Sequence, residues 1–415
     1  MWVPIINEQE ERGAICDILD NIYISLSKMI NGIEGINLYS GKSGFCLFMA
    51  YYQAMNKQCL HNIEGIVEAL VECAATYNAA GNKGVTYYSQ IAWLLCHLHD
   101  RKIIDIDVND YFSAIDEALY EVMTLLLKRG KYDCIDGAIS IGIYFYYRYI
   151  LGSEKCKQYL ALFVDVLKKT AIEEGNTMKW ISSIDYVTHE QGFDLGIAHG
   201  IPGILLFLRE LYMENIQKDI IADIITKATN FLLLQKRTLK THKALFPSAV
   251  SARPGASGDD SRLGWCYGDM SVGYALFMIS SLDGVVRQSV KESAMDILVS
   301  TADRTNLLDI GIVDASLCHG TAGLAHMYNR LYHMTDELTF RNAALYWYKE
   351  TTKMAKYDDG YAGYRHPDYC LEETERRRFN LYNLSFLTGI SGIGLSLLSA
   401  IYPIEPYWDR CLLLS

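Results

Sequence analysis

The sequence predicts an all-α protein in which about seven helical hairpins close into an α/α toroid, or barrel. Three observations lead to this prediction. Apolar residues recur at helical spacing over long stretches, only seven prolines interrupt the 415 residues, and a Gly-x-x-Gly turn followed by an apolar run appears repeatedly. Alternating patterns typical of strands are scarce. We expect one domain over residues 1–415.

Residues 220–235 illustrate the helical pattern. Their apolar side chains follow the i, i+3, i+4, i+7 spacing that gives a helix one buried face; they are Ile221, Ile224, Ile225, Ala228, Phe231 and Leu232.

The glycine turns place the hairpins in order along the chain. Four copies keep both glycines: LYSGKSGFCLFMAYY from Leu38, IAHGIPGILLFLREL from Ile197, LCHGTAGLAHMYNRL from Leu317 and FLTGISGIGLSLLSA from Phe386. Two copies, CIDGAISIGIYFYYR and WCYGDMSVGYALFMI, carry Ser140 and Ser271 in place of the second glycine. A seventh copy near residue 88, YYSQIAWLLCHLHD, keeps the apolar helix without the glycines, so we expect an uneven barrel there.

The spacing of these turns fits a repeat of two helices. The first glycines are Gly41, Gly137, Gly200, Gly268, Gly320 and Gly389. Once the copy near residue 88 is counted, they lie about 50–70 residues apart, which is long enough for a helix pair and its loops. An isolated Gly-x-x-Gly is a weak signal, but six copies followed by apolar runs make coincidence a poor explanation.

The composition and the net charge limit which partners and which cellular location we expect for the protein. The net charge of −11 provides no basic surplus for a nucleic-acid backbone. Eleven cysteines, without a Cys-x-x-Cys pair, favour reduced thiols and a cytoplasmic protein. The N-terminus does not resemble a signal peptide, and no uncharged apolar run reaches the roughly 18 residues of a membrane span.

Closure of the hairpins into a ring would bring equivalent positions of the repeats to the same end. The residues directly before the first glycines are Ser40, Asp136, His199, Tyr267, His319 and Thr388. Cys266 and Cys318 stand one position earlier. Neighbouring side chains diverge in a regular helix or strand, so Cys318 and His319 can serve one site only from an irregular turn.

Cys266, Cys318 and His319 form a candidate zinc set. Two cysteines and a histidine are a three-ligand combination that leaves the fourth position of catalytic zinc open. Thiolates favour zinc over magnesium or calcium. The alternative is that the cysteines belong to the hydrophobic core and the histidine to an ordinary structural hydrogen bond, and the spacing alone leaves both interpretations open.

SRLGWCYGD (261–269) and LCHG (317–320), with IAHG (197–200) upstream, resemble the lanthionine cyclases, the LanC-type enzymes of lanthipeptide biosynthesis. The resemblance covers the whole chain and implies a barrel of seven hairpins. It implies a lanthionine synthetase that binds one Zn²⁺ through Cys266, Cys318 and His319. It further implies that the enzyme adds cysteine thiols of a precursor peptide to dehydroalanine and dehydrobutyrine, which forms thioether rings.

The family's other functional residues fall on four positions of this sequence. Its acid/base histidine matches His199, its arginine and tyrosine match Arg262 and Tyr267, and its aspartate matches Asp133. Repeat position alone would select Asp136 in place of Asp133. Arg262 could also form an ordinary ion pair, and Tyr267 could simply pack.

The chemistry agrees with these assignments. A free thiol with a pKa near 8.5 is mostly protonated at neutral pH, and coordination to zinc deprotonates it. Addition to a dehydro residue creates an enolate, which Arg262 could stabilise and to which protonated His199 could supply a proton. Tyr267 could hydrogen-bond the same oxygen.

The resemblance also implies partners: a dehydrated precursor peptide with its leader, and a complex with a dehydratase and an export transporter. Through such a complex the protein would be peripheral to the inner face of the membrane. We expect the long loop 238–264 to border the peptide entrance, with His189 and Glu190 either nearby or on a solvated loop.

Three other functions are less consistent with the residues. A prenyltransferase also activates a thiol with zinc, but its ligand set includes an aspartate. A glycoside hydrolase needs two carboxylates flanking a cavity, and Asp133 and Asp136 are too close in sequence for that. A LanC-like scaffold that binds zinc and glutathione without catalysis would be favoured by loss of His199 or Arg262, and both are present.

Overall fold

Helices dominate the computed structural model and alternate between two layers. The structure describes residues 2–30, 35–56, 65–68, 70, 82–183, 190–253, 258–365 and 383–415. Within these ranges the inner layer consists of α2 (Lys42–Met55), α4 (Asn82–Asp100), α6 (Ala138–Ile150), α8 (Ile201–Met213), α10 (Gly268–Ile279), α12 (Thr321–Thr335) and α15 (Ile390–Ile401). Around it lie α1 (Gln9–Met29), α5 (Val108–Lys128), α7 (Glu154–Thr170), α9 (Lys218–Leu234), α11 (Gln288–Ala302) and α13 (Leu338–Lys353).

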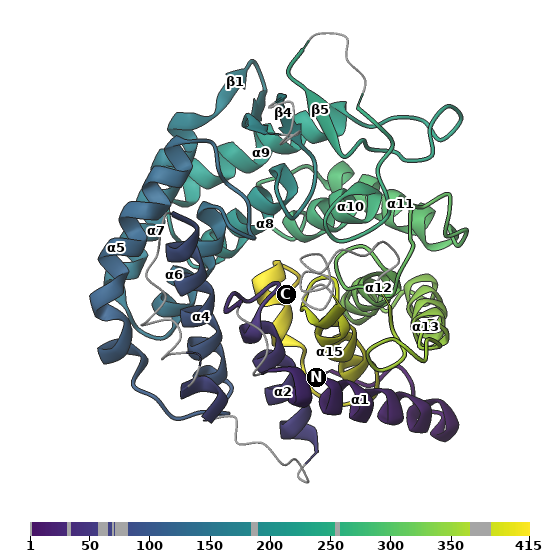
Figure 1. The fold of residues 1–415 in the computed structure, drawn as a ribbon. Coiled ribbons are helices and arrows are strands. Elements are labelled where there is room, and N and C mark those ends of the chain that lie inside the picture. The colour runs from purple at the N-terminus through teal and green to yellow at the C-terminus, as the bar shows by residue number, and fades with distance from the viewer. Residues whose placement is uncertain are drawn as a thin grey trace.

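The two layers differ in burial because they differ in sequence pattern. Inner helices such as α8 and α15 are apolar on nearly every face and almost completely buried. Outer helices bury one stripe; in α9 it contains the six apolar residues that the sequence predicted. Helix α15 packs against both α12 and α2, so the last hairpin closes on the first (Figure 1). The predicted all-α toroid is therefore confirmed.

Glycine precedes five of the inner helices because the chain turns tightly there. Gly41, Gly137, Gly200, Gly320 and Gly389 are the N-cap residues of their helices. The chain folds back tightly there, and a Cβ on Gly200 would lie 2.1 Å from the carbonyl oxygen of Asp194. The second glycine meets the same turn, since a Cβ on Gly323 would lie 1.9 Å from the carbonyl oxygen of Leu317. Where Ser271 replaces that glycine, its hydroxyl accepts the Ile197 N–H at 2.8 Å.

Backbone hydrogen bonds join many of the turns that precede the inner helices. They run from Cys134 N–H to the Ala198 carbonyl (3.0 Å), Trp265 to Cys318 (3.0 Å), Cys318 to Leu387 (2.8 Å) and Leu387 to Tyr39 (3.1 Å). Turns that are far apart in the sequence are thereby held edge to edge at one end of the ring.

Gln90 occupies the place of the missing turn in the hairpin without glycines. Its side-chain oxygen accepts the Leu38 N–H at 2.9 Å, and its amide nitrogen donates to the Ile135 carbonyl at 2.6 Å. Leu38 and Ile135 belong to the turns on either side. A buried backbone group without a partner costs about 1–3 kcal/mol. The side chain of Gln90 therefore does what a neighbouring main chain does elsewhere in the ring, and it reduces the unevenness expected at this point.

Two small antiparallel sheets interrupt the helical pattern. One pairs β1 (Ile172–Glu174) with β2 (Thr177–Lys179), and the other contains β3 (Ser182–Ser183), β4 (Gln191–Asp194) and β5 (Ala249–Ser251) in that order. In the second sheet Phe193 lies opposite Val250. This register fixes part of the long loop 238–264 beside the turn that leads into α8.

The centre of the ring is filled by residues that follow the last hairpin. The 3₁₀ helix η2 (Tyr407–Leu412) and the residues after it contact inner elements from several hairpins (Figure 1). Tyr39 donates its hydroxyl to the Cys411 carbonyl at 3.0 Å, Trp265 its indole N–H to Leu412 at 2.9 Å, and Tyr274 its hydroxyl to Leu414 at 2.6 Å.

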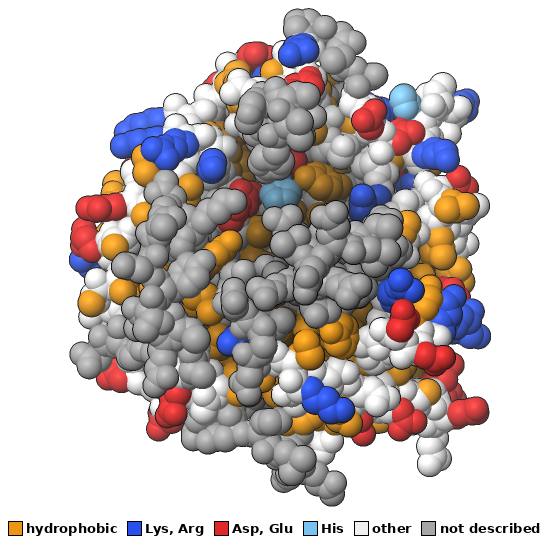
Figure 2. All heavy atoms as spheres, viewed as in Figure 1, with side chains coloured by type: hydrophobic (Ala, Val, Ile, Leu, Met, Phe, Trp, Pro, Cys, Tyr) orange, Lys and Arg blue, Asp and Glu red, His pale blue; other side chains and the backbone are white. Residues whose placement is uncertain are grey.

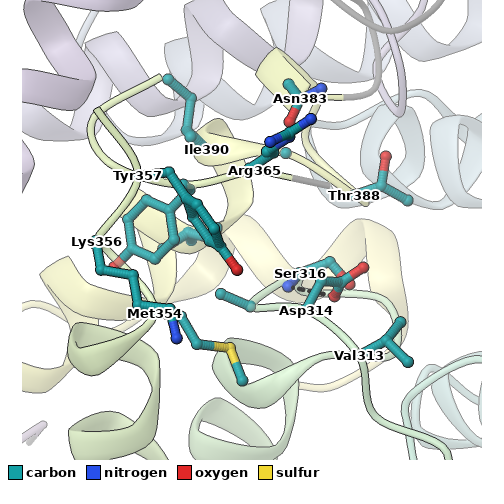
Figure 3. A pocket seen from close by; sticks show the side chains of 14 residues that line it. Val313, Asp314, Ser316, Met354, Lys356, Tyr357, Arg365, Asn383, Thr388 and Ile390 are labelled. Atoms are coloured by element: carbon teal, nitrogen blue, oxygen red, sulfur yellow. Dashed lines mark hydrogen bonds between the residues drawn. The ribbon is translucent and has the colours of Figure 1, made fainter. Parts of the chain in front are cut away.

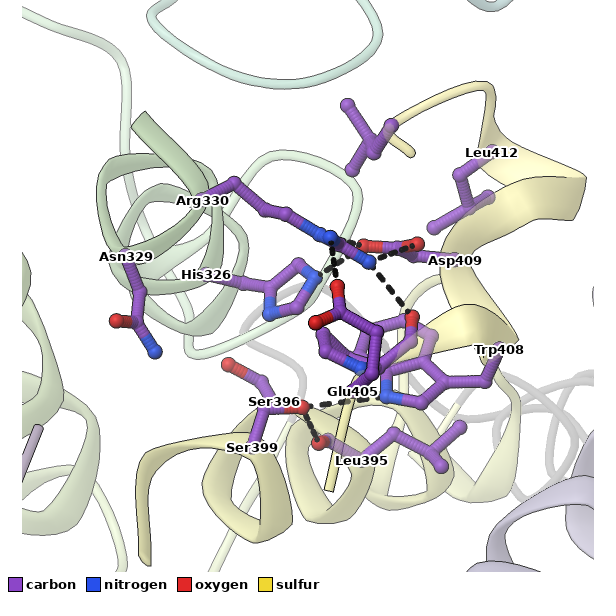
Figure 4. Close-up of polar contacts among 12 residues, drawn as sticks. His326, Asn329, Arg330, Leu395, Ser396, Ser399, Glu405, Trp408, Asp409 and Leu412 are labelled. Carbon is purple, nitrogen blue, oxygen red and sulfur yellow. Dashed lines mark hydrogen bonds and ion pairs between the residues drawn. The ribbon is translucent and has the colours of Figure 1, made fainter. Parts of the chain in front are cut away.

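A buried ionic network fixes this central segment to α12. The carboxylate of Asp409 accepts hydrogen bonds from Arg330 at 2.7 and 2.8 Å and lies 2.7 Å from His326 Nε2 (Figure 4). Arg330 also donates to Glu405 at 2.6 Å and to the Pro406 carbonyl at 3.0 Å. Each charge in this dry region has a partner, which is the condition under which buried ions are tolerated.

On the face of the molecule shown in Figure 2, acidic and basic side chains are interspersed among the described residues. None of the helices, over their described residues, is both long and apolar enough to cross a bilayer.

Candidate metal centre and catalytic pocket

The candidate zinc ligands lie in two turns that pack against each other. Cys266 precedes α10, and Cys318 and His319 precede α12. The N–H groups of Trp265 and Cys266 both donate to the Cys318 carbonyl, at 3.0 and 3.4 Å. A Cβ on Gly264 would lie only 3.1 Å from the Cα of His319, so glycine permits the approach. Because the chain turns at 317–319, adjacent side chains can serve one site.

One potential ligand atom from each of Cys266, Cys318 and His319 lies within 4.8 Å of the other two. Both cysteines are buried, with 6% and 8% of their surface exposed. A hydrogen bond from the Cys318 thiol is the main cause that lowers the pKa of Cys266, with His319 and Arg262 adding to it. The same bond and burial raise the pKa of Cys318. Two sulfurs and an imidazole nitrogen, poised around one point, fit zinc.

His199 lies beside Asp133, which comes from the turn of the preceding hairpin. The distance from His199 Nδ1 to Asp133 Oδ1 is 3.8 Å. Burial lowers the pKa of His199, but the carboxylate of Asp133 outweighs it and Asp194 assists, so the pKa rises to about 9. Asp133 is held in place by the N–H groups of Ile135 and Asp136, which it accepts at 3.0 and 2.8 Å.

Arg262 precedes Cys266 in the sequence and Tyr267 follows it, and both residues line the same pocket. Within the described ranges Arg262 makes no ion pair, so the alternative role of a loop salt bridge is not seen there. The ring centroids of Tyr267 and His199 are 6.1 Å apart. Tyr267 also hydrogen-bonds Asp194, whose pKa burial raises to about 7.

These residues surround one pocket of about 470 Å³. Besides the three candidate metal ligands, it is lined by His199, Arg262 and Tyr267, and by Ser248, Ala249, Asp260 and Ser261 from the long loop. Neither Asp133 nor Asp136 lines the pocket. Asp133 reaches it through His199, whose Nδ1 lies 3.8 Å from its carboxylate. The loop thus borders the pocket as far as it is described, while its Pro254 and also His189 lie outside the described residues. Glu190 accepts a hydrogen bond from the Ser251 hydroxyl at 2.6 Å.

A smaller cavity of about 170 Å³ lies beside the turn that precedes α12 (Figure 3). It lies between the turns before α12 and α15 and the C-terminal end of α13. Asp314 and Ser316 line it. Asp314 connects the two regions, because its Oδ2 is 3.8 Å from His319 Nε2.

The sequence analysis missed Asp194 and Asp314. Both stand six residues before the first glycine of their repeat, as does Asn383. The Oδ1 atoms of Asp194 and Asp314 accept the backbone N–H two residues later, each at 2.8 Å, which stabilises the turn. The repeated offset was a signal in the sequence, but the comparison of repeats extended only two residues upstream of the glycine.

Comparisons with known proteins were consistent with this geometry. A family model described as lanthionine synthetase C-like protein matches residues 32–413. A solved structure, nisin cyclase, is similar to the chain with a TM-score of 0.73 and 17% sequence identity, over 95% of this chain and 96% of that one. At this identity the likeness establishes the fold. No curated protein sequence matches the chain.

Proposed function

The chain belongs to the lanthionine synthetase C-like family, and on that premise we propose that it is a zinc-dependent lanthipeptide cyclase. Its substrate would be a precursor peptide in which serines and threonines have become dehydroalanine and dehydrobutyrine. The reaction adds cysteine thiols of that peptide to the double bonds and forms lanthionine and methyllanthionine rings.

One observation carries the proposal. A single pocket is lined by the three candidate zinc ligands, by a histidine that stays cationic at neutral pH and by an arginine without a described ion-pair partner. A conjugate addition needs these groups together. It needs an activated thiol, a positive charge for the developing enolate and a proton donor. Cys266, Cys318 and His319 would hold one Zn²⁺, which when bound activates the substrate thiol by lowering its pKa.

Arg262 would stabilise the electron pair that leaves the carbon–carbon double bond. As the sulfur bonds to the β-carbon, that pair moves toward the peptide carbonyl and forms an enolate. Tyr267 would donate its hydroxyl to the same oxygen. A positive charge at the wall of the pocket would stabilise the negative charge as it develops on that oxygen.

His199 would complete the addition by giving a proton to the α-carbon. Its Nδ1 faces Asp133, so Nε2 is the atom available to the substrate. Asp133 keeps the imidazole charged and oriented. The thiol loses one proton and the α-carbon gains one, so the ring forms with no change in peptide mass.

We also propose that the substrate arrives with its leader from a dehydratase and leaves through an export transporter, with the cyclase in the cytoplasm, peripheral to the membrane. Family membership supports these partners.

The test is incubation of the zinc-loaded protein with the dehydrated precursor peptide encoded beside its gene. We expect free thiols to disappear while the mass stays constant, and the Cys318→Ala variant to lose both zinc and at least about 1,000-fold in rate. Wild-type protein that binds zinc but leaves the thiols titratable would contradict the proposal and favour the non-catalytic scaffold that binds glutathione.

A further inference from the structure

Asp314 is buried beside His319 with its two oxygens in different roles. Only 5% of its surface is exposed. Oδ1 accepts the Ser316 N–H at 2.8 Å, and Oδ2 lies 3.8 Å from His319 Nε2 (the turn is seen in Figure 3). The first contact explains the turn. The second points a carboxylate at one nitrogen of a candidate metal ligand.

The orientation of His319 follows from this pair. An imidazole that binds a metal through one nitrogen almost always donates its other N–H to a carboxylate, carbonyl or water. Nε2 faces Asp314, which leaves Nδ1 for the metal. The separation exceeds a hydrogen bond by less than about 1 Å, and we expect it to shorten when Nδ1 binds zinc.

We propose that Asp314 is a positioning residue that orients His319 and fixes its tautomer, with the proton on Nε2, for zinc binding. This inference depends on the proposed zinc site. Asp314 touches neither substrate nor metal in this role, and acts through the histidine alone.

The repeats themselves separate this role from that of building the turn. Asn383 stands at the same offset in the next hairpin, so an uncharged amide occupies this position in an equivalent turn. Carboxylates occur at this offset in the hairpins that contribute His199 and His319 to the pocket. The turn does not require the negative charge, but the histidine uses it.

The decisive variant is Asp314→Asn, which keeps the acceptor oxygen and removes the charge. We expect its zinc affinity, measured by competition with a chromophoric chelator, to fall about 10–100-fold, while the melting temperature of the metal-free protein stays unchanged. The matched control is Asn383→Asp, which places a carboxylate in the equivalent turn without a metal ligand, and it should bind zinc like the wild type.

Asp314→Asn protein that binds zinc within about twofold of the wild type would overturn the inference. That result leaves the proposed function intact if the wild type binds zinc and forms rings, whereas a wild type without zinc would refute both. Should Asp314→Asn fail to fold, nitrogen-15 NMR of the zinc-loaded wild type decides: we expect His319 protonated on Nε2, and protonation on Nδ1 would contradict it.

Discussion

His199 and His326 each lie beside an aspartate, and these two pairs behave in opposite ways. His199 lines the pocket at the end of the ring, 3.8 Å from Asp133. His326 is buried in the centre, 2.7 Å from Asp409. The pKa of His199 is raised to about 9, whereas that of His326 is lowered. The histidine with the closer carboxylate is therefore the one with the lower pKa.

The difference comes from burial and from a competing cation. Burial penalises the charged form of both imidazoles. At the pocket, Asp133 and Asp194 outweigh that penalty. In the centre, burial is complete and Arg330, which pairs with the same Asp409, opposes a second positive charge on His326. In this molecule the carboxylate raises the pKa of its histidine only where it outweighs the effect of burial.

The largest effect should come from His199→Asn, because it removes the proposed proton donor at the pocket. We expect the cyclisation rate to fall about 100- to 10,000-fold, with zinc content retained. Single-turnover kinetics and metal analysis measure the two. A rate within threefold of the wild type would show that His199 is not the acid.

Arg330→Met should lower the stability of the protein and leave its catalytic rate unchanged. It leaves Asp409 buried without its main partner, which costs about 3–5 kcal/mol of stability, whereas the rate per folded molecule should stay the same. Denaturant titration checks the first and active-site-normalised kinetics the second. As a control, Lys353→Met breaks an exposed contact with Glu350 of 2.6 Å and should leave the free energy of unfolding nearly unchanged.

Asp133→Asn should make His199 resemble an ordinary histidine. The rate needs the protonated imidazole, so in the wild type it should be constant up to a pKa of about 9 and fall above it. Without the carboxylate the pKa returns toward about 6.5, and the rate at pH 8 should drop at least about tenfold. A pH–rate profile of both proteins tests this, and an unshifted basic limb would exclude Asp133 as the cause of the raised pKa.

The smallest effect should be a pair of opposite pH dependences of stability. The lowered pKa of His326 means that below about pH 6.5 the unfolded chain gains a proton that the native protein does not, so stability falls as the pH decreases. The stabilisation from protonated His199 is fully present below that pH and is lost as the pH rises through about 9. Urea titrations at pH 5, 7 and 9.5 should show His326→Asn flattening the acid limb and His199→Asn the alkaline one.

The repeated part of the fold was predictable from the sequence because its cause is local. Glycine is needed wherever a helix start meets the preceding turn, so Gly200 and Gly323 mark the architecture directly. The repeat alignment also brought together Cys266, Cys318, His319, His199 and Tyr267, since equivalent positions meet at one end of the ring. Arg262 and Asp133 came only from the resemblance to the family, because repeat position alone would select Asp136.

What could not be predicted depends on contacts between distant parts of the chain. His326 and Asp409 are 83 positions apart, and nothing near either residue indicates the other. Gln90 replaces a turn only because Leu38 and Ile135 come to lie on its two sides. The strands β3 to β5 are two to four residues long, too short for an alternating pattern to stand out.

The position of residues 407–414 in the middle of the ring has a consequence for biosynthesis. A ribosome makes the hairpins first, and until this stretch emerges the Arg330 guanidinium lacks Asp409, its partner in the folded ring. The hairpins that are made first therefore lack the segment that fills the centre of the ring. A stop codon just ahead of residue 405 should yield an aggregating chain for quality control to remove, not a slightly shorter enzyme.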